Sequence, residues 1–263
     1  MQRSFSLFQP SYHGLPKMKY IFLFDMDGTL CDSEEIYAKA MQNTLEQVIG
    51  TRIAFDVAIS YTLGHCVNDV IANVFSIYNI DLAKKDEFYH LIDNNFHQLR
   101  AKHLDKFLIT PTVELFKHLL TKGYPVGVVS GSSRHDIATV LNLMGIKSSV
   151  LIVGNEDYQH GKPSPEPYLT AAKRLHLSQE EIKHNVIVIE DSPVGVSAAL
   201  AAGMHVIGLQ GSLAKSLHEA GATAVLDKKD IGAEGKNEAK INLINWLSEY
   251  LSISTNGKNM RFN

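Results

Sequence analysis

Short apolar runs alternate with helix-like patterns over most of the chain. The apolar runs are long enough for buried strands and too short for most helices. Helical patterns between them begin near proline, serine or threonine and mostly end at glycine. Because strands that alternate with helices form parallel sheets covered by helices, the sequence predicts an α/β fold with a doubly wound parallel sheet. The strands are expected at 20–24, 125–129, 150–153, 186–189, 205–209 and 224–226.

One long segment interrupts this alternation. Between the first two strands the pattern is helical and contains no convincing strand, with helices expected near 33–49, 67–78 and 84–103. An all-helical insert of this size predicts a separate cap domain. The expected organisation is a flexible N-terminal extension (1–17), a core (18–31 and 108–251), a helical cap (32–107) and a polar tail (252–263).

Composition narrows the class of protein. The 263 residues are 45% hydrophobic, which is enough for one sizeable core and a smaller module. The net charge of −3 argues against nucleic acid or an anionic membrane as partner. Two cysteines cannot build a disulfide framework, and no apolar run has the length of a membrane span. The low cysteine count predicts a reducing, cytoplasmic location, and residues 1–17 do not form a convincing signal peptide.

Polar clusters follow the predicted strands where each strand ends. Asp25 and Asp27 follow the first strand, Ser130 follows the second, and the pair Glu190–Asp191 follows the fourth. Lys162 lies in the loop after the third strand. The carboxyl ends of parallel strands share one edge of a sheet, so these groups should converge. Converging carboxylates repel one another unless a cation lies among them, and hard oxygen ligands suit Mg²⁺.

The four clusters together resemble the four motifs of the haloacid dehalogenase-like hydrolases, in the same chain order. The resemblance covers roughly residues 19–230. The position of the cap and the Glu-Asp pair are similar to the β-phosphoglucomutase-like subfamily, which also contains many phosphatases. The motifs are Asp25-Met26-Asp27-Gly28-Thr29, Ser130 after Val128-Val129, Gly161-Lys162-Pro163, and Glu190-Asp191-Ser192 with Gly195.

The resemblance implies phosphoryl transfer. Asp25 would attack phosphorus and form an aspartyl-phosphate, while Asp27 would act as general acid and base. The Mg²⁺ ligands would be the Asp25 side chain, the Asp27 backbone carbonyl and Asp191, with Glu190 a direct or supporting ligand. The groups expected to bind the phosphoryl oxygens are Ser130, Gly131 and Lys162.

The preferred hypothesis is a Mg²⁺-dependent phosphatase that acts on a sugar phosphate or a nucleotide-like monophosphate. Cap residues Tyr37, His65 and Asn68 are expected to contact the leaving group. A phosphosugar mutase is the first alternative, although Tyr37 stands where the mutases carry histidine and 64–68 lacks their arginine. A non-hydrolytic phospho-accepting signalling module and a catalytically idle partner-binding protein are further alternatives. The expected partner is a small-molecule phosphate ester, and the expected state is a monomer or weak homodimer.

Overall fold

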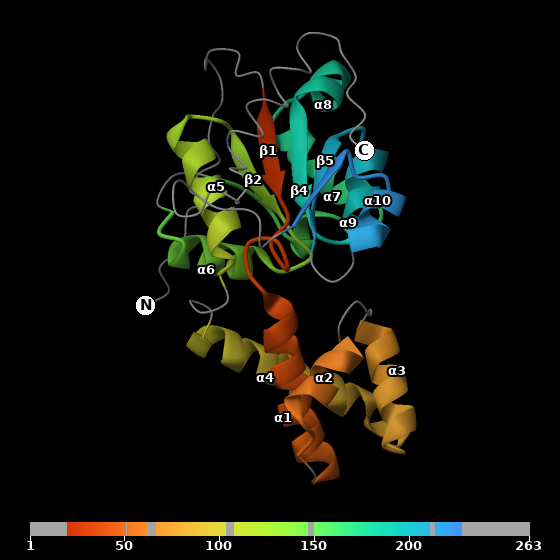
Figure 1. The fold of residues 1–263 in the computed structure, drawn as a ribbon. Helices are drawn as coiled ribbons and strands as arrows, with labels where there is room; N and C mark the ends of the chain where they lie inside the picture. The colour runs from red at the N-terminus through yellow and green to blue at the C-terminus, as the bar shows by residue number, and fades with distance from the viewer. Residues whose placement is uncertain are drawn as a thin grey trace. The chain divides into compact units, whose positions relative to one another are not determined.

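The computed structural model describes residues 20–50, 52–62, 67–103, 108–146, 150–210 and 214–227. The chain divides into two compact units (Figure 1). One unit contains Met1–Leu30 and Ile109–Asn263, and the other contains Cys31–Leu108. The expected N-terminal extension and polar tail lie outside the described residues, as does 241–251, where the sequence pattern also predicts a helix.

The first unit is built on one six-stranded sheet in which every pair of neighbouring strands is parallel. The strand order is β3-β2-β1-β4-β5-β6, so β1 is central and the chain reverses its direction of winding beside it. Ligands bind at such a switch point, beyond the carboxyl ends of the strands. The strands are β1 (Ile21–Phe24), β2 (Val126–Val129), β3 (Leu151–Val153), β4 (Val186–Glu190), β5 (His205–Gln210) and β6 (Ala224–Asp227).

Helices connect the strands of this unit. Ser178 and Glu181 form a capping box at the start of α8, and Ser192 caps α9 by accepting from the Gly195 amide. Ser133 caps α6 through the Asp136 amide. The described helices are α5 (Thr110–Thr121), α6 (Arg134–Leu143), η3 (Asn155–Asp157), α7 (Glu166–Arg174), α8 (Gln179–Asn185), α9 (Pro193–Ala201) and α10 (Ala214–Glu219).

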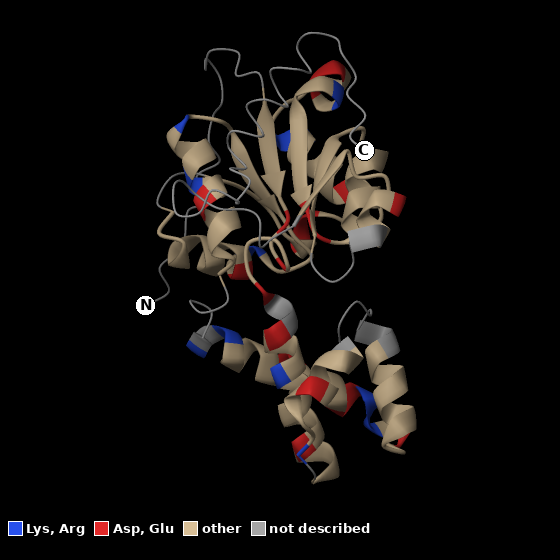
Figure 2. Cartoon of the chain, viewed as in Figure 1, with Lys and Arg blue, Asp and Glu red and all other residues tan. Residues whose placement is uncertain are grey.

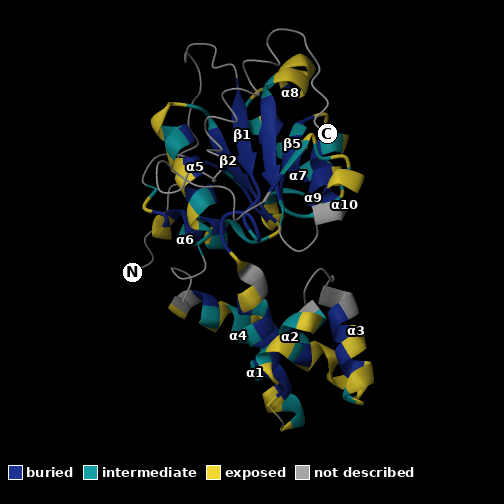
Figure 3. Ribbon diagram, in the orientation of Figure 1, coloured by how far each residue is buried: buried dark blue, intermediate teal, exposed yellow. Residues whose placement is uncertain are grey.

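Apolar side chains cover both faces of the sheet, which is why β1 and β4 are buried along their whole length (Figure 3). Ile21 and Leu23 share a core cluster with residues of α7, α8, α9 and α10. On the other face, Phe24 packs edge-on against Phe116 of α5, with ring centroids 5.0 Å apart. The predicted α/β fold with a parallel sheet is therefore confirmed.

The second unit contains helices and no strand among its described residues. Its core gathers apolar side chains from its helices, including Phe75 and Phe88, whose ring centroids lie 5.1 Å apart. One helix here was not expected from the sequence, because 55–62 opens without a recognisable capping residue. The helices are α1 (Ser33–Ile49), α2 (Phe55–Thr62), α3 (Val67–Ile77), η1 (Leu82–Lys84) and α4 (Lys85–His103).

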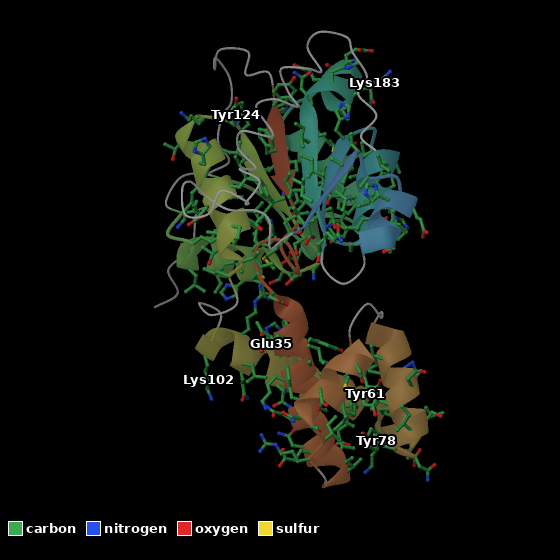
Figure 4. All side chains as sticks on the ribbon, in the orientation of Figure 1. Glu35, Tyr61, Tyr78, Lys102, Tyr124 and Lys183 are labelled. Carbon is green, nitrogen blue, oxygen red and sulfur yellow. The ribbon has the colours of Figure 1, made fainter. Side chains whose placement is uncertain are left out.

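Tyr61 and Tyr78 join α2 to the end of α3 in this unit (Figure 4). Their hydroxyl oxygens lie 3.4 Å apart, and this hydrogen bond is the main reason why the pKa of Tyr78 rises to about 12. None of the described helices combines the length and the apolar character needed to cross a bilayer.

Candidate active site

The polar groups that follow the strands are held at one edge because the sheet's hydrogen bonding continues past the strand ends. The Asp25 amide donates to the Ile189 carbonyl at 2.9 Å, which fixes the first aspartate beside the end of β4. The Ser130 amide donates to the Val153 carbonyl at 3.0 Å, which fixes the serine beside the end of β3. Sheet register therefore brings together residues that are far apart in sequence.

Lys162 lies at the centre of this group. Its Nζ donates to Asp25 Oδ1 at 2.6 Å, to Glu190 Oε1 at 2.7 Å and to the Val129 carbonyl at 3.3 Å. Only 12% of the lysine side chain is exposed. The structure thus places an ammonium group between two carboxylates that come from the ends of β1 and β4.

Burial and neighbouring charges shift the pKa values of Asp25 and Lys162. Burial raises the pKa of Asp25 well above its usual value; Lys162 opposes this rise, and nearby carboxylates add to it. Burial acts in the opposite direction on Lys162, but Asp25 and Glu190 outweigh it and raise the pKa of the lysine. The lysine is therefore charged, and a further cation near Asp25 would favour its anionic form.

Asp27 accepts two serine hydroxyl groups on one carboxylate oxygen. Ser130 Oγ donates to Asp27 Oδ2 at 3.1 Å, and Ser132 Oγ donates to the same atom at 2.7 Å. The Ser132 amide in turn donates to Ser130 Oγ at 3.0 Å. The second aspartate is therefore oriented by the loop that follows β2.

Glu190 is fully buried, and both of its carboxylate oxygens accept hydrogen bonds. Oε1 accepts from Lys162 Nζ and from Tyr168 Oη. Oε2 accepts from the amides of Asp191 and Ser192 and from Ser192 Oγ. Gly195 leaves the space that this carboxylate fills, because a Cβ at that position would overlap it.

Three carboxylates could hold a metal ion. Asp25, Glu190 and Asp191 each offer one oxygen, and these oxygens lie within 4.8 Å of one another. Acidic residues gather at this edge of the sheet in Figure 2. Gly28, at φ 85°, makes room for Asp191, because a Cβ there would overlap its carboxylate. An all-oxygen set of this kind suits Mg²⁺, which keeps open positions for water and phosphate.

The structure describes the three predicted cap residues to different extents. Tyr37 is partly buried, and its ring packs edge-on against Phe96 at 6.1 Å. Its hydroxyl is buried without a hydrogen-bond partner within the described ranges, and burial raises its pKa. His65 lies outside the described residues, while Asn68 lies on α3 with its side chain not described. Contact of these three residues with substrate stays a prediction.

Sequence reasoning did not single out three residues that contact this group. Ser132 follows Ser130 by two positions, and the run Ser-Gly-Ser-Ser was the available signal. Tyr158 donates its hydroxyl to the Ser130 carbonyl at 3.0 Å, and Tyr168 donates to Glu190 at 3.2 Å. Tyrosines are common apolar fillers, so nothing in the sequence distinguishes these two from the other eight.

The family is established by comparison with known proteins. The model of the haloacid dehalogenase-like hydrolase family matches residues 22–209, which include all four predicted motifs. The chain belongs to this family.

Individual relatives agree with this assignment. The chain is 32% identical over 210 residues to a bifunctional riboflavin kinase/FMN phosphatase of Arabidopsis thaliana, covering 78% of this chain but 52% of that protein. It is 27% identical to hexitol phosphatase A of Escherichia coli, covering 72% of this chain and 82% of the relative. A solved hydrolase of the same family from Deinococcus radiodurans R1, crystallised with bound phosphate and sodium, is 26% identical. That structure has a TM-score of 0.60 and the match covers 80% of this chain and 91% of that one.

Proposed function

We propose that this protein is a Mg²⁺-dependent phosphatase that hydrolyses a small phosphate monoester through a phosphoryl group carried on Asp25. The observation that supports this most directly is the position of Lys162 Nζ, 2.6 Å from Asp25 Oδ1 and 2.7 Å from Glu190 Oε1. A buried ammonium beside a nucleophilic carboxylate offsets the repulsion between that carboxylate and an incoming phosphate.

In the first half-reaction an oxygen of Asp25 attacks phosphorus, and the bond from phosphorus to the ester oxygen breaks. Asp27 gives its proton to the departing oxygen, so the leaving group departs as a neutral alcohol. Ser130 and Lys162 give up hydrogen bonds to protein oxygens and donate to the phosphoryl oxygens, whose charge increases during transfer.

In the second half-reaction water attacks the phosphorus of the aspartyl-phosphate. Asp27, now a carboxylate, accepts a proton from that water, and the bond between phosphorus and Asp25 breaks to release phosphate. Ser132 Oγ, which donates to Asp27 Oδ2 at 2.7 Å, keeps this side chain oriented after Ser130 has turned to the phosphoryl group.

Asp25, Asp191 and the Asp27 backbone carbonyl would hold Mg²⁺. When bound, this ion supplies positive charge that neutralises the attacking carboxylate and the phosphate together. Glu190 is better suited to support these groups than to bind the metal, because hydrogen-bond donors already occupy both of its oxygens. EDTA is expected to abolish turnover and excess Mg²⁺ to restore it; turnover unaffected by EDTA would exclude this role.

The relatives suggest phosphate monoesters of small metabolites as the substrate class. FMN, hexitol phosphates and other sugar phosphates form the first panel, because an FMN phosphatase and a hexitol phosphatase are similar to this chain. The assay measures phosphate release with Mg²⁺, and the Asp25→Asn variant provides the blank. Release at the blank rate for every phosphate ester would overturn the proposed function.

The alternative reactions differ in where the phosphoryl group goes. A phosphosugar mutase would return it to a sugar, so a sugar bisphosphate would label the enzyme and yield sugar phosphate in place of inorganic phosphate. A signalling module would keep the phospho-aspartate for minutes or longer. Rapid loss of the label to water distinguishes the phosphatase from both, and loss of the label to sugar would establish the mutase.

A further inference from the structure

Two tyrosines on either side of Lys162 in the sequence reach to two different strand ends. Tyr158 lies four residues before the lysine, and its hydroxyl donates to the Ser130 carbonyl at 3.0 Å. Tyr168 lies six residues after it, and its hydroxyl donates to Glu190 Oε1 at 3.2 Å. The segment that carries the lysine is thus hydrogen-bonded to the end of β2 and to the end of β4.

The Tyr168 hydroxyl group is not required for packing. Tyr168 is fully buried within the core cluster between the sheet and α7. A phenylalanine would fill the same space without a buried hydroxyl group that needs a partner. The hydroxyl does have a partner, and that partner is the carboxylate that also accepts from Lys162. The lysine ammonium also lies 5.1 Å from the centroid of the Tyr168 ring.

Lys162 needs such support because its side chain is a flexible four-carbon stem with a point charge at its end. The loop before it is already held at its base. Glu166 accepts from the amides of Gln159 at 2.8 Å and His160 at 2.9 Å. These bonds shape the loop itself, whereas the Tyr158 hydroxyl ties the loop to the serine that follows β2.

We propose that Tyr158 and Tyr168 are positioning residues that fix Lys162 and Ser130 relative to Asp25. The inference rests on the proposed phosphatase function, since it assigns these tyrosines to the same reaction. Tyr158 sets the separation between the lysine loop and Ser130. Tyr168 orients Glu190, which in turn orients the ammonium group between Glu190 and Asp25.

The test uses the full chain and three variants that each remove one hydroxyl group: Tyr158→Phe, Tyr168→Phe and, as control, Tyr124→Phe. Tyr124 precedes β2 and so lies at the opposite edge of the sheet, where its ring packs against Phe22 with centroids 5.4 Å apart (Figure 4). For each variant, kcat, KM, the inhibition constant of orthovanadate and Tm are measured with Mg²⁺ and the best substrate of the panel.

Both site variants should lose about tenfold in kcat, equivalent to about 1.4 kcal/mol, with KM changed by less than about twofold. Vanadate should bind about tenfold more weakly, because it mimics the transferring phosphoryl group. Tm should stay close to that of the wild type, since the ring and its packing remain. Tyr124→Phe should match the wild type in all four measurements.

Wild-type kcat and vanadate binding in both site variants would overturn the proposal. So would a loss of kcat that only follows a fall in Tm, because that would indicate a purely structural role. An effect in one variant alone would remove the other tyrosine from the proposal.

Hydrogen exchange separates this proposal from the proposed function. Peptides that cover 126–134 and 154–166 should exchange faster in Tyr158→Phe than in the wild type, whether or not any ester is hydrolysed. If the wild type is inactive but exchange increases, the proposed function fails and the tie between the two loops stands. If the wild type is active and neither exchange nor kcat changes, only the tyrosine proposal fails.

Discussion

At the scale of single residues, the site depends on how charge is balanced around Asp25. Its carboxylate is buried and lies close to other acidic groups, and both effects favour its neutral form. A neutral acid would be a poor nucleophile. The Lys162 ammonium group, whose Nζ lies 2.6 Å from Asp25 Oδ1, favours the charged carboxylate instead. A bound Mg²⁺ would favour the charged form further.

The two aspartates should give different defects when each loses its charge. Asp25→Asn removes the nucleophile and is expected to lower turnover by several orders of magnitude. Asp27→Asn keeps the nucleophile but removes the acid and base, so slow formation of phosphoenzyme should remain while its hydrolysis stalls. Quenched-flow labelling measures the two steps separately. Turnover like that of the wild type in either variant would contradict the assigned role.

Activity should be as sensitive to substitution of Gly195 as to substitution of a charged residue of the site. In Gly195→Ala the new Cβ would overlap the Glu190 carboxylate and displace it from Lys162. We expect roughly a 100-fold loss of kcat, because a displacement of about 1 Å at a catalytic group costs that much. Ser197→Ala on the same helix is the control. The Ser197 hydroxyl is exposed and donates to the Pro193 carbonyl of its own helix. Full activity in Gly195→Ala would show that Glu190 does not depend on this space.

The sequence could identify charged residues at this scale but not their hydrogen-bond partners. Asp25, Ser130, Lys162 and Asp191 each follow a predicted strand, so topology alone brings them to one edge. The partners of Glu190 depend on side-chain directions that periodicity does not encode. Ser132 and Tyr168 were missed for that reason.

At the scale of elements, apolar runs predicted every described strand of the sheet to within one residue at each end. Buried parallel strands are apolar on both faces, and this makes them easy to recognise. Helices with a capping signal, such as Ser178 with Glu181, were also predictable. Helix α2 was not, because it opens at Phe55 without a serine, threonine or proline to mark its start.

The turn after β3 should show a pH-dependent stability through Asp157. Burial would raise the pKa of this carboxyl, but hydrogen bonds from Arg174 and the Gly154 amide outweigh burial and lower it. A lowered folded-state pKa gives stability that is complete above the unfolded value near 3.9 and is lost as the pH falls through the folded value.

Asp157→Asn should therefore lower the free energy of unfolding at pH 7 by about 1–2 kcal/mol, because it weakens hydrogen bonds between charged groups. The difference from the wild type should begin to shrink below about pH 4, because the unfolded chain then binds a proton that the folded carboxylate binds only at lower pH. Urea denaturation at pH 7 and at pH 3 measures it. Asp93→Asn, whose side chain is 69% exposed, is the control. A difference that stays constant with pH would contradict the electrostatic explanation.

At the scale of the whole molecule, the chain forms two units with separate cores. The helical insert was predictable because a long strand-free segment interrupts a regular alternation of strands and helices. Substrate specificity was not, because hydrophobic periodicity and site motifs do not encode which side chains contact a leaving group.

Separate cores predict separate responses to mutation. Phe88→Ala should destabilise the helical unit by about 3–5 kcal/mol, since Phe88 is fully buried against Phe75. Leu82→Ala should change stability by less than about 0.5 kcal/mol, because Leu82 is 74% exposed. In Phe88→Ala, hydrogen exchange should increase in peptides from 67–103 and stay unchanged in peptides from 186–210. Equal increases in both would indicate that the two units unfold together.

The central claim is that Asp25 carries the phosphoryl group during turnover. The most direct test is to mix the protein with Mg²⁺ and a hydrolysed substrate, quench with acid within milliseconds, and locate the modification by mass spectrometry. We predict one phosphoryl group on Asp25 that disappears as substrate is exhausted. Phosphate release without any modified Asp25, or with the phosphoryl group on another residue, would contradict the account.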